Sequence, residues 1–242
     1  MTLYRTRTQE ERDTIVANLG EPYAKENFLS QNEIKQLIEL YKVSQNKVEK
    51  NTGPVTSDFC QDMDSIPILK TIKQRIIDEV GDCDVYTGFY FYVTRPHIIH
   101  NDDDKLGPVI YKAFTLPLAV EYVSEDVGYP KLCFFDQYYL EGPSKFFNGA
   151  TVDIPTFYNT QVYEYSQVKN KSNKPFDQNV FNKYLTHLKP NWLTGLSFKT
   201  AIEWRPGNAI VFDCARLHCA SDFLAQGIKS KLGISIFTKL RQ

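Results

Sequence analysis

From Cys83 onward, the chain is dominated by short runs of tyrosine, phenylalanine and valine that are separated by turn residues. Aromatic and β-branched side chains pack well on a pleated surface, so such runs are typical of β-strands. So many short strands favour two packed sheets or a closed barrel, and a jelly roll is the leading choice among these folds. We expect strands over residues 85–93, 112–123, 131–137, 196–204, 208–212 and 232–238.

Three helices are predicted before the first of these strands. Thr8 with Glu11, and Ser30 with Glu33, form capping boxes, in which a hydroxyl and a carboxylate satisfy the free amides at the start of a helix. A third helix is expected over residues 65–80, because its apolar side chains recur at helical spacing and its proline falls in the first turn. We expect these helices to brace the sheet rather than to carry chemistry.

With 242 residues, the chain suits one large domain better than two. We expect a single domain over residues 1–242, in which 1–82 form a helical support and 83–242 form the β core. The core carries an insertion at about 138–195, where aromatic clusters alternate with turn residues. Its aromatic-rich part, residues 134–165, is a candidate substrate pocket or lid, although core packing explains many of these aromatics equally well.

Composition excludes several classes of protein. The formal net charge is −1, from 28 lysines and arginines against 29 aspartates and glutamates, so no electrostatic footprint for nucleic acid or a membrane is present. Nucleic acid stays open as a substrate. The five cysteines include no CxxC pair, which argues against a disulfide framework and a zinc knuckle. The first 21 residues hold no apolar run, so we expect a soluble cytoplasmic protein.

The strand predicted at 85–93 leads to a candidate metal site. If strand geometry continues to Asp102, then His100 and Asp102 point to the same side, because side chains alternate along a strand. One more histidine would complete a site of two imidazoles and one carboxylate, which leaves coordination positions open and suits Fe(II). In a jelly roll, His218 can return beside this pair, because it lies at the far end of a strand that begins after a tight turn at 205–208.

Two other histidines compete for the third position. His97 precedes His100 by three residues and follows a proline, so a place in a loop or pocket wall is favoured. His187 lies near the end of a helix that Asp177 can cap, where a cation interacts well with the helix dipole and a structural role is favoured.

An ordered set of motifs now resembles a known family. A His-x-Asp motif is followed by Pro206-Gly-Asn-Ala-Ile-Val-Phe-Asp213, a second histidine and a basic residue that enters a final strand. This order resembles the Fe(II)- and 2-oxoglutarate-dependent dioxygenases, over residues from about 83 to 239. The resemblance implies a double-stranded β-helix, the cupin-like jelly roll, braced by amino-terminal helices. It also implies that His100, Asp102 and His218 bind iron.

The resemblance further implies a basic residue that holds the far carboxylate of 2-oxoglutarate. Lys231 is our choice and Lys229 the alternative, although many members of the family use arginine. Alternation along the last strand puts Lys231, Gly233 and Ser235 on one face, where the glycine would leave room for the cosubstrate and the serine could add a hydrogen bond.

A tyrosine on the strand before the His-x-Asp motif often assists the same carboxylate in this family. Tyr90 and Tyr92 are the candidates, and because they share a face the sequence does not choose between them.

The implied activity is hydroxylation of a small molecule or a side chain, with O2 and 2-oxoglutarate as cosubstrates. Two alternatives stay open: a jelly-roll binding protein without catalysis, and an iron-dependent oxygenase that does not use 2-oxoglutarate. The sequence does not indicate the substrate or the oligomeric state, because fold and metal site are shared by enzymes that act on different molecules.

Overall fold

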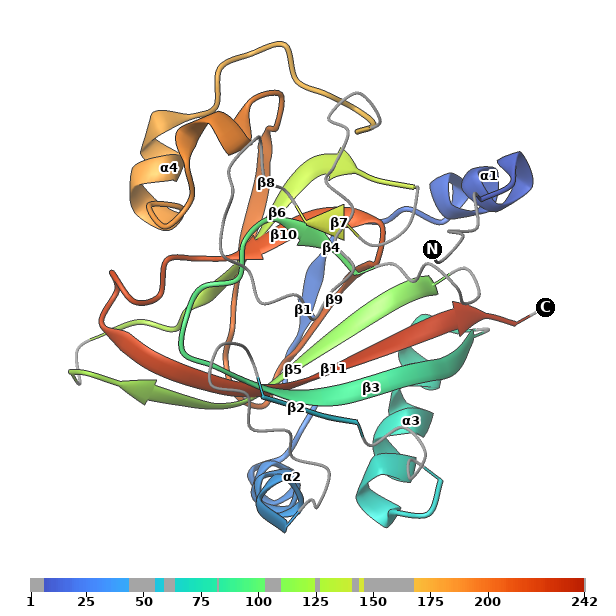
Figure 1. Ribbon diagram of the computed structural model, residues 1–242. Coiled ribbons are helices and arrows are strands. Elements are labelled where there is room, and N and C mark those ends of the chain that lie inside the picture. Colours follow the sequence, from blue (N-terminus) through green and yellow to red (C-terminus); the bar gives the residue numbers. More distant parts are fainter. Residues whose placement is uncertain are drawn as a thin grey trace, which may run out of the picture.

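Two antiparallel β-sheets face each other across a core of aromatic side chains in the computed structural model (Figure 1). The structure describes residues 7–43, 55–58, 64–81, 83–102, 110–124, 127–140, 144–145 and 168–241. Most of the aromatic-rich segment that was a candidate pocket or lid therefore lies outside the described residues.

The larger sheet has six strands in the order β1-β9-β5-β11-β3-β2. Its long central strand, β11, pairs antiparallel with β3 on one side and with β5 on the other. Strands that are distant in sequence are therefore neighbours in space. The strands are β1 (Tyr23–Lys25), β9 (Ala209–Asp213), β5 (Ile110–Tyr122), β11 (Ile228–Leu240), β3 (Cys83–Val93) and β2 (Val55–Asp58).

The smaller sheet has five strands in the order β7-β4-β10-β6-β8. Its strands come from four separate parts of the chain, so the expected fold, mainly β with flanking helices, is confirmed. The strands are β7 (Ser144–Lys145), β4 (His100–Asn101), β10 (Arg216–Ala220), β6 (Lys131–Tyr138) and β8 (Phe198–Glu203).

The predicted helix starts are confirmed. The Thr8 hydroxyl accepts from the Glu11 amide at 3.2 Å, while the Thr8 amide donates to the Glu11 carboxylate at 2.8 Å. Ser30 and Glu33 form the same pair of bonds, at 3.3 and 2.7 Å. The helices are α1 (Gln9–Ala17), α2 (Gln31–Val43), α3 (Pro67–Val80) and α4 (Gln178–Tyr184), with a 3-10 helix, η3 (Pro190–Leu193), after the last.

Each sheet is covered on its outer face. Helices α2 and α3 lie against the outer face of the larger sheet (Figure 1), and their apolar side chains pack with those of its strands. Leu185 and Leu188, at and after the end of α4, pack with Trp192 of η3 and the outer side chains of β6 and β10 on the smaller sheet. The space between the sheets holds a third cluster, which includes Phe134, Trp204 and Phe212. Among the described residues, no helix is both long and apolar enough to cross a membrane.

One strand prediction needs a correction that matters for the site. His218 does not lie at the end of the strand that begins after the tight turn. That strand, β9, ends at Asp213, and the chain turns at residues 214–215 and enters β10 in the other sheet. The turn contains no glycine or proline, so the sequence gives no local signal for it. His218 consequently lies in the smaller sheet, beside β4.

Candidate metal centre

Strands β4 and β10 bring two histidines side by side. His100 and His218 are direct partners across the antiparallel pair, and their ring centroids lie 4.2 Å apart. Asp102 follows β4 at once, and its amide donates to the carbonyl of Cys214 at 2.9 Å. The turn between β9 and β10 therefore fixes the backbone that carries the carboxylate.

The three side chains converge on one point. Nε2 of His100 lies 3.5 Å from Oδ1 of Asp102, and Nε2 of His218 lies 3.4 Å from Oδ2 of the same carboxylate. One ligand atom from each residue can be chosen so that all three lie within 4.8 Å of one another. The structure thus brings together the three residues that the sequence singled out.

Backbone carbonyls orient both imidazoles. Nδ1 of His100 lies 2.7 Å from the Ile98 carbonyl oxygen, and Nδ1 of His218 lies 3.0 Å from the Arg216 carbonyl oxygen. A carbonyl only accepts hydrogen bonds, so each Nδ1 carries a proton, and in the neutral ring each Nε2 presents a lone pair. Two lone pairs and a carboxylate then face one another, an arrangement that repels itself unless a cation lies between them. The donor set fits a divalent metal, and the carbonyls are the partners that hold metal-bound histidines in place.

Burial favours the neutral state of His100. His100 is 9% exposed, and its burial, followed by the neighbouring His97 and His218 rings, holds its pKa well below the usual range. A neutral imidazole is the form that binds a metal, so the histidine needs no deprotonation to act as a ligand.

Aromatic rings wall the centre on the inner side. The rings of Phe212 and Phe134 lie 4.6 and 5.8 Å from the His218 ring, and both phenylalanines are buried. On the other side, the exposed His97 places its ring 4.1 Å from that of His100. The centre therefore lies between an apolar core and the molecular surface. His97 lies in the segment between β3 and β4, which agrees with the loop position that the sequence allowed for it.

Lys231, at the beginning of β11, is buried between the sheets at 5% exposure. Its ammonium lies 5.0 Å from the Trp204 ring and 5.4 Å from the Phe223 ring. Burial lowers its pKa to about 8, against the smaller opposing influence of Cys133 and Cys219, and no carboxylate of the described chain contributes.

Lys229 differs sharply from Lys231. Its side chain is 65% exposed, and it pairs with Glu121 at 2.6 Å on the surface. Of the two lysines considered from the sequence, Lys231 alone faces the space between the sheets, so the geometry favours it as the anchor of a buried anion.

The expected assistance from Tyr90 or Tyr92 is wrong. Lys231 pairs with Val93, and Tyr90 and Tyr92 pair with Ile234 and Leu232, so both tyrosines share the opposite face of the sheet. The Tyr90 hydroxyl donates to the Leu37 carbonyl of α2 at 2.9 Å, and Tyr92 packs against the same helical layer. The register of β3 on β11 decides which face of the sheet the two tyrosine side chains occupy. A local sequence pattern does not reveal this register.

Two further residues on β11 were expected to serve the cosubstrate. Ser235 lies on the same face as Lys231, opposite Phe89, and is partly exposed. Gly233 does not leave a free space. A Cβ atom there would lie 2.6 Å from Trp204 and 2.8 Å from Phe91, because these rings already fill the room that the glycine creates.

Sequence reasoning missed the rings that enclose Lys231. Trp204 and Phe223 come from separate segments, and neither stands in a motif that points to the lysine. Burial also lowers the pKa of His187, which favours the neutral form of its ring.

Comparison with known proteins supports the fold. Neither a protein-family model nor a curated protein matches the sequence. The structure resembles HygX from Streptomyces hygroscopicus, solved with nickel and 2-oxoglutarate bound, with a TM-score of 0.50, 12% identity, and coverage of 97% of this chain and 87% of HygX. At this identity the likeness establishes a shared fold, and it confirms the jelly-roll prediction.

Two more similar structures have lower scores. A Pseudomonas putida prolyl-4-hydroxylase matches with a TM-score of 0.48 and 9% identity, over 95% of this chain and 97% of that one. The epimerase SnoN, in complex with Fe3+, alpha ketoglutarate and nogalamycin RO, matches with a TM-score of 0.49 and 10% identity, over 95% of this chain and 82% of that one.

Proposed function

We propose that the protein is a non-haem iron oxygenase that couples the oxidative decarboxylation of 2-oxoglutarate to the hydroxylation of a substrate. The convergence of His100, Asp102 and His218, with three electron-pair donors facing one point, carries the proposal. The fold shared with HygX, a protein solved with nickel and 2-oxoglutarate bound, supports it.

The three converging residues would hold Fe(II). Two imidazoles and one carboxylate leave coordination positions for a cosubstrate and for O2. Bound iron supplies the activation of O2, and the overall reaction converts 2-oxoglutarate, O2 and a C–H group into succinate, CO2 and a hydroxyl group. The Ile98 and Arg216 carbonyls keep the histidine rings fixed, and the buried Phe134 and Phe212 limit water at the inner side.

Lys231 would bind the far carboxylate of 2-oxoglutarate. A buried ammonium without a carboxylate partner is unfavourable, and an incoming carboxylate removes that cost. Trp204 and Phe223 exclude water from this ion pair and so strengthen it. Ser235, on the same face, would add a hydrogen bond.

The substrate would reach the centre from the side of His97. This residue is exposed, yet its ring lies against that of the buried His100, so the metal ligands lie within one side chain of the surface. A small molecule or a side chain of another protein could present a C–H group there. Among the described residues, the buried cysteines Cys83, Cys133, Cys214 and Cys219 form no disulfide, which supports a reducing, cytoplasmic location.

The test is succinate formation from 2-oxoglutarate by purified protein, with and without Fe(II). We expect iron-dependent succinate formation, which occurs at a basal rate even without the true substrate, and its loss in His100→Ala and Asp102→Ala. Asp84→Ala is the matched control, because this carboxylate pairs with Arg241 on the surface of β3. Full activity of metal-free wild type would sink the assignment.

Two further measurements separate the two alternatives. A binding protein without catalysis would show no thermal shift with Fe(II) plus N-oxalylglycine, an inert analogue of 2-oxoglutarate. An iron oxygenase that does not use 2-oxoglutarate would keep its substrate oxidation in Lys231→Ala.

A further inference from the structure

Residues 18–21, which join α1 to β1 and which we call the strap, are held by a buried ion pair. The Lys112 ammonium donates to the Asn18 carbonyl at 3.1 Å, and the Gly20 amide donates to the Asp213 carboxylate at 2.8 Å. Lys112 and Asp213 also pair with each other, with side chains 14% and 6% exposed. The backbone of the strap thus bonds to both members of the pair.

A third charged residue, Arg216 of the smaller sheet, also bonds to the strap. The Arg216 guanidinium donates to the Gly20 carbonyl at 2.9 Å and to the Phe135 carbonyl at 3.2 Å. Arg216 is 6% exposed, so these bonds form away from water. Gly20 is therefore bonded on one side to the end of β9 and on the other side to the beginning of β10.

The strap bonds to the same turn that supports the metal ligands. Residues 213–216 connect the two sheets, and the Cys214 carbonyl accepts from the Asp102 amide at 2.9 Å. The Arg216 carbonyl accepts from Nδ1 of His218 at 3.0 Å. Two of the three proposed ligands thus take their position from a turn whose ends are held by the strap.

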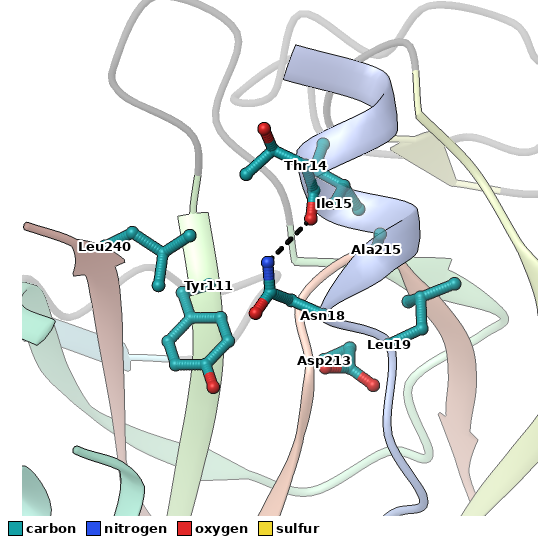
Figure 2. Close-up of a pocket in the computed structure, with 8 residues that line it drawn as sticks. All are labelled: Thr14, Ile15, Asn18, Leu19, Tyr111, Asp213, Ala215 and Leu240. Atoms are coloured by element: carbon teal, nitrogen blue, oxygen red, sulfur yellow. Dashed lines mark hydrogen bonds between the residues drawn. The ribbon is translucent and has the colours of Figure 1, made fainter. Parts of the chain in front are cut away.

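Helix α1 adds little apolar burial of its own. Ile15 is its only buried residue among those described, and it packs with Leu19 and Ala215. A pocket that is partly open to solvent lies between the end of α1 and the side chains of Tyr111 and Leu240 (Figure 2). The polar bonds of the strap therefore hold α1 against the turn.

We propose that the strap is a positioning element of the metal centre, so that divalent metal binding and the docking of α1 stabilise each other. This inference rests on the proposed function, since it takes His100, Asp102 and His218 as the ligands. Coupling between two sites is reciprocal: if a docked strap raises metal affinity, bound metal raises the stability of the docked strap by the same factor.

The first test is Co(II) binding to the full chain, followed by the visible ligand-field spectrum. Asp213→Asn keeps the shape of the side chain but weakens both bonds to Lys112 and Gly20. We expect Co(II) affinity to fall by up to roughly tenfold, the lower end of the effect of removing a partner that bonds a ligand directly, because Asp213 acts through the turn; the spectrum should change as well. Lys112→Arg keeps a positive charge beside Asp213, so this variant should bind Co(II) with nearly wild-type affinity.

The matched control is Glu33→Gln, which breaks a partly buried ion pair with Arg75 between α2 and α3. It should lower the melting temperature without altering Co(II) affinity or the spectrum. Equal Co(II) affinity in Asp213→Asn and Glu33→Gln would overturn the coupling. Wild type that binds no Co(II) would instead overturn the proposed function.

A second test needs no mutation, so it stands even if Asp213→Asn does not fold. Amide hydrogen exchange is compared in wild type with and without Co(II). We expect slower exchange across residues 9–20 when Co(II) is bound, because the metal stabilises the turn to which Gly20 bonds. Unchanged exchange in this segment, with metal bound, would overturn the proposal.

Discussion

The two faces of the larger sheet bury very different kinds of side chain. The outer face packs apolar side chains against α2 and α3, and its buried Tyr90 hydroxyl finds a backbone carbonyl. The inner face buries the Lys231 ammonium, and its Phe212 ring lies 4.6 Å from the ring of His218 in the smaller sheet. One face gains stability from burial, whereas the other holds polar groups that become favourable only when a ligand pairs with them.

The largest expected effect lies on the inner side. Asp102→Asn replaces the carboxylate that faces both histidine Nε2 atoms. Iron affinity should fall by more than the roughly 10–100-fold expected for an outer-shell change, and succinate formation should vanish. Metal analysis after dialysis checks this. Retention of one iron per chain by Asp102→Asn would contradict the proposed role of this carboxylate as a metal ligand.

A change on the outer face should affect stability alone. Leu37→Ala removes a fully buried side chain from α2, and the free energy of unfolding should fall by about 2–5 kcal/mol. Below its melting temperature, the variant should form succinate at the wild-type rate. Urea unfolding and the succinate assay measure the two quantities, and a matched loss of specific activity would contradict the separation.

Removal of the inner cation should raise stability and remove function. One pKa unit corresponds to about 1.4 kcal/mol, so lowering the Lys231 pKa to about 8 costs about 3 kcal/mol at neutral pH. Lys231→Met should recover much of this in the ligand-free protein and should lose the thermal shift produced by N-oxalylglycine. A less stable variant would show that the ammonium has a partner of its own.

The lysine also predicts a pH dependence. Its folded pKa of about 8 lies below the usual 10.5, so the unfolded chain binds more protons between these values and stability should rise with pH across that window. Affinity for 2-oxoglutarate should change in the opposite direction and weaken above about pH 8, because the amine must take up a proton to bind a carboxylate. Calorimetric titrations at several pH values measure this, and Lys231→Met is the control.

The smallest expected effect concerns Tyr90, whose hydroxyl bonds to α2 on the outer face and not to the cosubstrate. Tyr90→Phe removes one buried hydrogen bond to Leu37, so stability should fall by about 1 kcal/mol. The Michaelis constant for 2-oxoglutarate should not change, since the hydroxyl lies on the outer face. A raised Michaelis constant would return this residue to the site.

Local signals predicted the helices well, and the three residues that the sequence proposed as metal ligands lie close together. The capping boxes at Thr8 and Ser30 involve residues three apart, so their partners can be read directly from the chain. His100 and Asp102 are two apart, and His218 was reached through the order of motifs rather than through spacing.

Long-range pairing explains what the sequence did not predict. The face taken by Tyr90 and Tyr92 depends on which residue of β11 lies opposite each one, and a shift of one residue would reverse it. The filling of the space beside Gly233 by Trp204 likewise depends on a contact across the two sheets. The sequence of a single strand therefore predicts neither the face of the tyrosines nor the filled space beside Gly233.

The lone pairs of His100 and His218 have a practical consequence for handling the protein. Two imidazoles and a carboxylate bind first-row divalent ions in the Irving–Williams order, in which Ni²⁺, Cu²⁺ and Zn²⁺ all exceed Fe²⁺. Protein purified on a nickel column should therefore carry the wrong ion and be inactive until a chelator strips it and Fe(II) is added back. The specific activity of a preparation will then depend on the metal ions to which it was exposed as well as on the sequence of the protein.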